Sequence, residues 1–373
     1  MKTTKQLHVF YKERLVGTLA LSENHKAAFA YDDEWLKSGF SITPFSLPLK
    51  KQVFLPAKDH FQGLFGVFAD SLPDAWGSLL LKRLIEKNGI SADSLNVLDR
   101  LAIVGKAGMG ALTYHPEMTL SVQHSPGDLD QLARECKKIL HAEYSDDLDT
   151  LYQLGGTSGG ARPKIMTEID GKEWIIKFPA HIDGEDSGRM EYEYSLCAKK
   201  CGITMTETRL FSSKNCAGYF GIQRFDRKPG KKRVHMLTAA ALLELDYRQP
   251  SLDYHSLMKL TKILTGNNRQ DMEEMFRRMC FNVFAHNRDD HSKNFSYLYH
   301  EEKDCWRLSP AYDLTYSSTY YGEHTTTVNG NGKDPGAKDL LAVGAAAGLK
   351  ETVCKNIMEQ TESCVQKMLR EWI

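Results

Sequence analysis

The sequence has no excess of either charge, because 48 lysine and arginine residues balance 48 aspartate and glutamate residues. A dominant nucleic-acid or anionic-membrane surface, which needs a strong basic surplus, is therefore not expected. Long apolar runs are also missing: the longest, residues 340–349, is far shorter than the roughly 20 residues that span a bilayer. Because residues 1–6 lead into a strand-like stretch without a signal-peptide core, we expect a cytoplasmic protein with no membrane partner.

The eight cysteines include no C-x-x-C pair, which excludes a zinc ribbon and a thioredoxin-type redox motif. Buried, reduced thiols are the expectation. The chain has 373 residues, of which 42% are hydrophobic and 26% charged, as in ordinary globular proteins. At roughly 100–200 residues per domain, this length predicts two or three domains.

The periodicity of apolar residues predicts a mixed fold. Alternation predicts a β-hairpin within residues 6–31, and a helix is expected to begin near Pro73 with Ser71 as its cap. The glycine string at 105–110 has the order G-x-x-G-x-G, which does not match a dinucleotide fingerprint and predicts a turn. Further strands are predicted at 165–169, 174–178, 208–211 and 219–225, and helices at 129–140, 191–202, 272–285 and 350–372.

A glycine-rich loop at residues 154–164 leads into a predicted hairpin whose second strand carries Lys177. Glycines let backbone N–H groups close on phosphate oxygens. The first half of a Walker A loop is present, but Ala161 and Arg162 replace its Lys-Ser/Thr end, so a P-loop NTPase is contradicted. A glycine loop followed by a strand lysine is how protein kinases cover ATP, although each feature alone is also common at protein surfaces.

The segment 284–297 is dense in reactive side chains. Arg288, Asp289 and Asn294 reproduce the Arg-Asp-x-x-x-x-Asn spacing of a kinase catalytic loop, with Asn287 in place of its histidine. Asp313 follows a predicted strand, where the metal-binding aspartate of a kinase would lie. The order of glycine loop, strand lysine, Asp, Asn and later Asp therefore favours phosphoryl transfer.

A second interpretation of the same segment is a metal site. His286, Asp289, Asp290 and His291 are four good ligands within six positions, which would suit a metal-dependent phosphohydrolase. Such a site would not use the glycine loop or Lys177. We keep it as the lesser alternative.

Together these motifs resemble the HipA family of toxin kinases. The resemblance covers about residues 7–370 and lies in D-S-L-P-D-A-W-G at 70–77, G-A-L-T-Y-H-P at 110–116, the loop at 154–164, R-F-D-R at 224–227, N-R-D-D-H-S-K-N at 287–294 and P-A-Y-D at 310–313. It implies an α+β, protein-kinase-like two-lobed fold with a mixed β N-lobe, a mainly helical C-lobe and a family-specific N-terminal subdomain. The implied units are the subdomain at 1–116, the N-lobe at 117–225 and the C-lobe at 226–373.

The resemblance also implies the site of an ATP-dependent serine/threonine protein kinase. Asp289 would be the catalytic base, and Asn294 and Asp313 would hold Mg²⁺ or Mn²⁺. The hydroxyls of Thr157 and Ser158, in the glycine loop, are the candidates for self-phosphorylation. The residues expected to contact ATP are Gly159, Gly160, Ala161, Arg162, Pro163, Lys164, Lys177, Gln223, Arg224, Phe225, His291, Ser292, Lys293 and Tyr312.

By the same resemblance, the partners would be a protein substrate, such as an aminoacyl-tRNA synthetase, and a cognate DNA-binding antitoxin, with DNA contacted only through that antitoxin. A kinase-fold binding or regulatory module with little turnover is the alternative. The presence of Lys177, Asp289, Asn294 and Asp313 favours the enzyme, since a pseudokinase has usually lost at least one of these groups.

Overall fold

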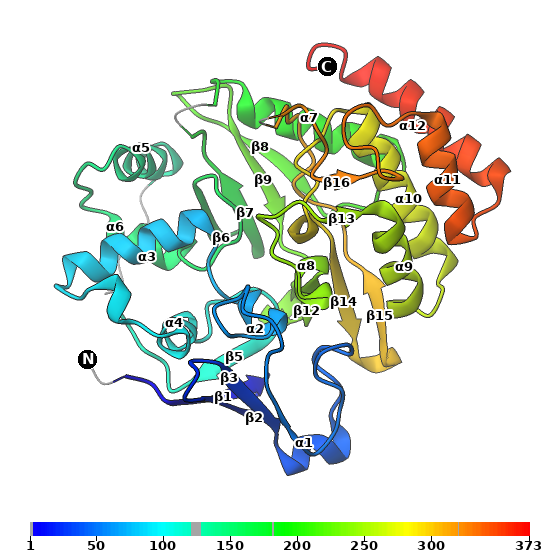
Figure 1. The fold of residues 1–373 in the computed structure, drawn as a ribbon. Helices are drawn as coiled ribbons and strands as arrows, with labels where there is room; N and C mark the ends of the chain where they lie inside the picture. Colours follow the sequence, from blue (N-terminus) through cyan, green and yellow to red (C-terminus); the bar gives the residue numbers. More distant parts are fainter. Residues whose placement is uncertain (1–2, 121–127, 181–182, 320) are drawn as a thin grey trace.

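The computed structural model describes residues 3–120, 128–180, 183–319 and 321–373 (Figure 1). Its amino-terminal part is a five-stranded antiparallel sheet in the order β4-β3-β2-β1-β5, and the predicted hairpin is its β1–β2 pair. Alternate residues of β1, Leu7, Val9 and Tyr11, are buried on one face. The elements of this part are β1 (Gln6–Tyr11), β2 (Arg14–Leu21), β3 (Ala27–Tyr31), α1 (Asp33–Ser38), β4 (Val53–Phe54), α2 (Gly66–Ala69), α4 (Val97–Val104) and β5 (Leu112–His115).

Helix α3 (Ala75–Lys87) belongs to a different core from the sheet that precedes it. Its buried face, with Trp76, Leu80 and Leu84, packs with residues of α5 (Leu129–Leu140), α6 (Leu148–Gly155) and the strands that follow. The expected cap is wrong: Asp74 is the N-cap residue, and the Ser71 hydroxyl instead bonds to the Tyr114 hydroxyl at 2.7 Å. The side chain of Asp74 caps no backbone group of α3, because it is engaged in the site described below.

A four-stranded antiparallel sheet in the order β6-β7-β9-β8 forms the middle of the chain. The predicted strands and turn are confirmed: Asp170 and Gly171 link β6 to β7 with positive φ angles of 53° and 72°. The helix expected at 191–202 begins earlier, at Ser187, and ends at Lys200. The elements are β6 (Lys164–Ile169), β7 (Lys172–Lys177), α7 (Ser187–Lys200), β8 (Thr208–Phe211) and β9 (Tyr219–Gln223).

The carboxyl-terminal part is mainly helical. The helices predicted at 272–285 and 350–372 correspond to α10 (Arg269–Phe284) and α12 (Glu351–Met368). Its helices are α8 (Ala239–Leu243), α9 (Tyr254–Leu264), α10 (Arg269–Phe284), α11 (Ala337–Ala347) and α12 (Glu351–Met368). Its strands are β10 (Arg227–Lys228), β11 (Lys232–Arg233), β12 (Met236–Thr238), β13 (Leu252–Asp253), β14 (Ser296–His300), β15 (Cys305–Leu308) and β16 (Thr326–Thr327). The expected α+β architecture, in which a strand-rich part is followed by a mainly helical part, is therefore confirmed.

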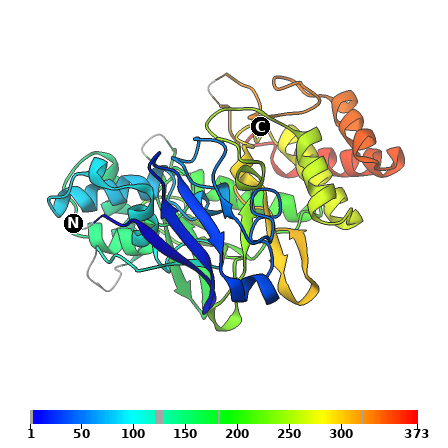
Figure 2. The ribbon, with the colours of Figure 1, turned by 60° about the horizontal axis from the view of Figure 1, so that its bottom comes forward.

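The amino-terminal sheet packs against the carboxyl-terminal part, with which it shares one apolar core (Figures 1 and 2). The rings of Phe40 and Tyr299 stack with centroids 3.9 Å apart, and His235 Nε2 lies 2.8 Å from the Ile42 carbonyl oxygen. Because α3 meanwhile packs on the middle part, the first 115 residues contact both lobes. The domain boundaries expected from the sequence stay a prediction.

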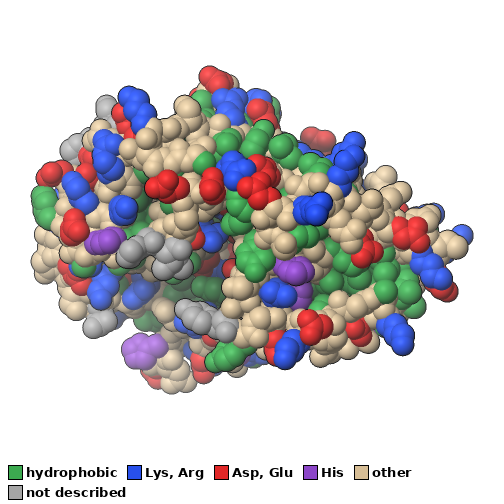
Figure 3. All heavy atoms as spheres, turned by 90° about the horizontal axis from the view of Figure 1, so that it is seen from above, with side chains coloured by type: hydrophobic (Ala, Val, Ile, Leu, Met, Phe, Trp, Pro, Cys, Tyr) green, Lys and Arg blue, Asp and Glu red, His purple; other side chains and the backbone are tan. Residues whose placement is uncertain are grey.

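The surface agrees with the balanced composition. Acidic and basic side chains are interspersed over the face seen in Figure 3. Among the described residues, no helix is both long and apolar enough to cross a membrane.

Candidate active site

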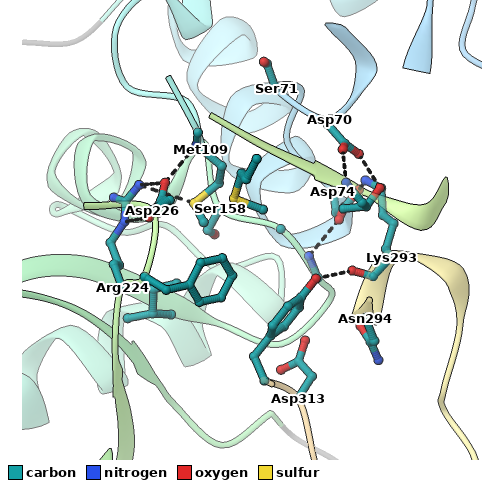
Figure 4. A pocket seen from close by; sticks show the side chains of 18 of the residues that line it. Asp70, Ser71, Asp74, Met109, Ser158, Arg224, Asp226, Lys293, Asn294 and Asp313 are labelled. Atoms are coloured by element: carbon teal, nitrogen blue, oxygen red, sulfur yellow. Dashed lines mark hydrogen bonds and ion pairs between the residues drawn. The ribbon is translucent and has the colours of Figure 1, made fainter. Parts of the chain in front are cut away.

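A cavity lies where the amino-terminal part, the four-stranded sheet and the segment after α10 meet (Figure 4). Most of the residues expected from the sequence line it: Ser158, Gly159, Gly160, Lys164, Lys177, Gln223, Arg224, Phe225, His291, Lys293, Asn294, Tyr312 and Asp313. The amino-terminal part adds residues for which the sequence suggested no role in the site, chiefly Asp70, Ser71, Leu72, Asp74, Met109 and Gly110. Other expected residues lie outside the lining, namely Thr157, Ala161, Arg162, Pro163, Asp289 and Ser292.

Lys177, at the end of β7, forms ion pairs with both Glu191 of α7 and Asp313. Burial raises the pKa of Asp313, but the Lys177 and Lys164 ammonium groups outweigh it and hold this pKa well below the usual range. Burial lowers the pKa of Lys177, and the two carboxylates reverse this, so its pKa lies above the usual value. Lys177 and Asp313 are therefore both charged near neutral pH.

Asp313 also has an unusual backbone. Its φ of 53° lies in the left-handed region, which non-glycine residues rarely adopt and which is common at functional sites. The preceding residue, Tyr312, fixes this turn, because its hydroxyl donates to the Lys293 carbonyl oxygen at 2.6 Å. The Tyr312 ring lies 5.5 Å from the Phe225 ring, on the wall of the cavity.

The glycine loop is attached to the amino-terminal part. The Gly160 N–H donates to the Asp74 carboxylate at 2.9 Å, and the indole N–H of Trp76 donates to the Lys164 carbonyl oxygen at 3.1 Å. The other Asp74 oxygen pairs with Lys293, from the segment after α10. Asp74 thus links the loop to that segment, as Figure 4 shows.

Lys164 points back into the loop, where its ammonium group donates to the Gly159 carbonyl oxygen. Burial lowers the pKa of Lys164 to about 8. Gly160 has a φ of 85°, and a Cβ built there would lie 2.5 Å from Lys164 Nζ. Glycine is therefore required at this position.

Thr157 and Ser158 are both buried. The Thr157 hydroxyl donates to the Ala107 carbonyl oxygen at 2.9 Å, and the Ser158 hydroxyl donates to the Gly155 carbonyl oxygen at 2.6 Å. Neither hydroxyl is accessible in this conformation of the loop.

Asp289 and Asp290 differ sharply, although they are neighbours after α10. The Asp289 side chain is 60% exposed, and its backbone carbonyl accepts a hydrogen bond from Asn294 Nδ2 at 2.7 Å. Asp290 is buried, and its carboxylate is held by the Tyr254 hydroxyl, His324 and the Thr326 N–H at 2.9–3.0 Å. Asp290 therefore stabilises the segment, while Asp289 faces outward.

The alternative metal site on this segment gains no support. The Asp290 carboxylate is already fully engaged, and His286 lies beside the Tyr316 ring. Within the described part of the chain, His286, Asp289, Asp290 and His291 do not bring three ligand atoms together. His291 instead lines the cavity, where its Nδ1 is buried without a hydrogen-bond partner among the described residues.

Ion pairs between arginine side chains and Asp226 stabilise the part of the cavity wall that the R-F-D-R motif forms. Arg224 binds Asp226 with two hydrogen bonds of 2.9 Å, and the Gly110 N–H donates to the same carboxylate at 2.8 Å. Arg227 and Arg233 bond to carbonyl oxygens of residues 106–110. The glycine string is therefore a turn, as expected, but one that fixes Met109 and Gly110 against the cavity.

Glu191 and Asp74 are among the carboxylates of this site that the sequence analysis missed. Glu191 lies near the start of a helix that was expected, and its place after the strand lysine is the signal that could have revealed it. Asp74 lies in the 70–77 motif, but its contact with Lys293 spans 219 positions, which no local pattern predicts.

Comparison with known families finds two matches that divide the chain. The family described as HipA-like C-terminal domain matches residues 156–369, and the HipA N-terminal domain matches residues 7–115. A protein named "Putative kinase Y4dM", from Sinorhizobium fredii, is 25% identical, with 96% of this chain and 88% of that protein covered. Another from the same organism, "Putative kinase Y4mE", is 24% identical, with 85% and 79% covered.

Among solved structures, the chain is similar to one of the toxin–antitoxin complex of HipA, HipB and operator DNA from Shewanella oneidensis MR-1. The TM-score is 0.73 at 18% identity, and the alignment covers 98% of this chain and 90% of the other. At this identity the likeness shows a shared fold.

Proposed function

This chain belongs to the HipA family, and on that premise we propose that it is an ATP- and Mg²⁺-dependent serine/threonine protein kinase acting as the toxin of a toxin–antitoxin pair. Assignment as a kinase rests on the family and on relatives named as kinases. The observation that carries the finer proposal is that Lys177 contacts both Glu191 and Asp313 beside a glycine loop. Kinases use such a lysine to position phosphates.

The phosphate end of ATP fits the cradle beneath residues 158–160. Lys164, Lys177 and Lys293 line the same cavity as these loop residues. These three cations would offset the phosphate charge. The unpartnered Nδ1 of His291 offers one more polar contact.

The adenine end fits the apolar wall formed by Ile175, Ile222 and Phe225. The N–H groups of Gln223 and Arg224 already donate to the carbonyl oxygens of Glu207 and Glu173, at 2.9 and 2.8 Å. We therefore expect Phe225 to supply the backbone N–H that meets the base, and Arg224 to act through its bonds to Asp226.

Magnesium fits the side-chain oxygens of Asp313 and Asn294, which both line the cavity. Asp313 is ionised because its pKa is depressed, and Asn294 lies at the same end of the cavity in Figure 4. Carboxylate and amide oxygens are the ligands that Mg²⁺ accepts. When bound, the ion would neutralise charge on the β- and γ-phosphates.

Asp289 would act as the base. Its carboxylate is exposed and lies outside the cavity lining, which leaves it accessible to a protein substrate. In the proposed step the serine or threonine oxygen bonds to the γ-phosphorus, its proton passes to Asp289, and ADP leaves. The N–H···O bond from Asn294 to the Asp289 backbone holds the two residues in register.

The partners are proposed from the family. The related structure contains HipA with HipB and operator DNA, which supports a DNA-binding antitoxin as partner, with DNA contacted through it. A translation component such as an aminoacyl-tRNA synthetase is the proposed substrate. Because Thr157 and Ser158 are buried, self-phosphorylation would require the loop to leave its site, and the added charge would then keep it out.

Induced expression in a bacterium tests this proposal against a binding module with little turnover. The wild-type chain should arrest growth and produce new phosphoserine or phosphothreonine sites in quantitative phosphoproteomics, including Thr157 or Ser158 if the loop is modified. Asp289→Ala should express as a folded protein and do neither. Equal toxicity of the Asp289→Ala chain would instead support the binding module.

A further inference from the structure

Three cysteine thiols from two helices lie together, away from the proposed nucleotide site. Cys197 is on α7, Cys201 is the residue that caps the carboxyl end of α7, and Cys364 is on α12, which packs against α7 (Figure 1). Their three sulfur atoms all lie within 4.8 Å of one another. Cys197 and Cys364 are 167 positions apart, so cysteine spacing could not reveal the group.

The surroundings of this group are apolar on most sides. Cys197 is fully buried and Cys201 is 5% exposed, in a core that also contains Tyr194, Phe281 and Val365. Cys364 is partly exposed, so the group has one side toward solvent. On that side the Met368 thioether sulfur lies 3.7 Å from Cys364 Sγ.

We propose that Cys197, Cys201 and Cys364 bind a single Cu⁺ ion, with the Met368 thioether as an outer sulfur contact. Thiolate and thioether sulfurs are soft ligands that favour Cu⁺. Structural zinc sites are almost always four-coordinate, with cysteine, histidine or carboxylate ligands. In the described part of the chain, this group includes only the three cysteines, which suits three-coordinate Cu⁺ better than Zn²⁺.

Binding requires that the coordinated thiols lose their protons to solvent. The hydrogen bond with Cys197 and burial raise the pKa of Cys201, and burial raises the pKa of Cys364 to about 11. The thiols of Cys201 and Cys364 are therefore protonated at neutral pH, and the ion must displace these protons. Arg277 and Lys200 lie close enough to favour the thiolates, which partly offsets the negative charge that the site gains.

The site would connect two parts of the chain. Helix α7 also carries Glu191, the partner of Lys177, and α12 is the last helix of the carboxyl-terminal part. An ion shared by the two helices would restrain α7 and stabilise the folded state by mass action.

The test is an anaerobic titration of the full chain with Cu⁺ supplied as its coloured bicinchoninate complex. The protein should withdraw one equivalent of Cu⁺, X-ray absorption should show only sulfur ligands, and the melting temperature should rise. Cys364→Ser should weaken binding at least 100-fold, and because Cys364 is partly exposed this variant should stay folded by circular dichroism. Met368→Leu should weaken it by a smaller factor.

The matched control is the Cys216→Ser, Cys305→Ser double variant, which removes the two other partly exposed thiols and should bind like the wild type. Copper left with bicinchoninate, or a Cys364→Ser chain that still withdraws one equivalent, would overturn the proposal. Displacement of the bound Cu⁺ by an equal concentration of Zn²⁺ would also overturn it, in favour of a zinc site.

Discussion

Asp74 and Lys293 form an ion pair that joins the start of α3 to the segment after α10. The same carboxylate accepts the Gly160 N–H, so one side chain from the amino-terminal part contacts both the glycine loop and the segment after α10. Burial lowers the pKa of Lys293, but Asp74 and Asp70 reverse this and raise it above its usual value. The amino-terminal part is thus built into the site.

Asp74→Ala should loosen the glycine loop. The Gly160 N–H and the Lys293 ammonium would both lose their partner, so amide hydrogen exchange across residues 156–162 should speed up at least tenfold. Asp74→Asn keeps an oxygen for the N–H and should change exchange much less. Glu86→Gln, in an exposed pair at the far end of α3, is the control. Unchanged exchange in Asp74→Ala would show that Asp74 does not hold the loop.

Glu191→Gln should lower kinase activity while leaving the fold intact. Lys177 would keep Asp313 as a partner but would no longer be held toward α7, and misplacing a phosphate-positioning group costs about 100-fold in rate. Glu193→Gln, two positions along α7 and paired with Arg189 at 3.2 Å, should leave activity unchanged. Comparable activity of the two variants in an initial-rate assay would count against a role for Glu191.

Nucleotide affinity should fall as the pH rises through about 8, the pKa of Lys164 in its buried position. Below this pH Lys164 is charged and attracts phosphate, whereas above it the free protein holds a neutral amine. Lys177 stays charged throughout, because its pKa is raised. Calorimetry should show ATP affinity falling by at most about tenfold per pH unit above 8. Lys164→Arg should remove this pH dependence of ATP affinity. If that variant shows the same pH dependence as the wild type, Lys164 is not its cause.

Asp70 should make the protein less stable as the pH rises from about 4 to 6. Burial raises the pKa of Asp70 from 3.8 to about 6, so the folded state binds the carboxyl proton more tightly than the unfolded state does. The stability that this proton contributes is lost as the pH rises through about 6, the pKa of Asp70 in the folded state. Asp70→Asn should make the melting temperature nearly independent of pH in this range. The pKa of Asp226 is shifted in the opposite direction: burial raises it, but Arg224 outweighs burial and lowers it to about 2. The stability that Asp226 contributes is therefore lost only in strong acid. A melting profile between pH 4 and 6 that Asp70→Asn leaves unchanged would contradict the assignment.

Local patterns predicted the elements well because apolar periodicity directly reflects burial. Helix α5 has the predicted bounds, and the Asp170–Gly171 turn follows from two residues that tolerate positive φ. The cap of α3 was predicted wrongly because the Ser71 hydroxyl bonds to the Tyr114 hydroxyl, far along the chain, and not to the helix. Helix propensity carries no information about that competition.

The part of the site that could not be predicted from the sequence is its set of contacts between residues far apart in the chain. Lys177 and Asp313 were both singled out from motifs, but their direct contact depends on packing between the two lobes. Glu191 and Asp74 needed the same packing to become visible. Asp289 and Asp290 are the same residue type, so the sequence could not predict that only Asp290 is buried.

The most direct test of the account compares the wild-type chain with Asp289→Asn and Asp290→Asn, using radiolabelled γ-phosphate and total bacterial protein as acceptor. Asp289→Asn should bind ATP with Mg²⁺ as the wild type does in calorimetry, yet transfer phosphate about 1,000-fold more slowly, as expected for loss of a general base. Asp290→Asn should instead lower the melting temperature, because it disturbs the buried bonds to Tyr254 and His324. Phosphate transfer by Asp289→Asn at the wild-type rate would contradict the proposed kinase mechanism.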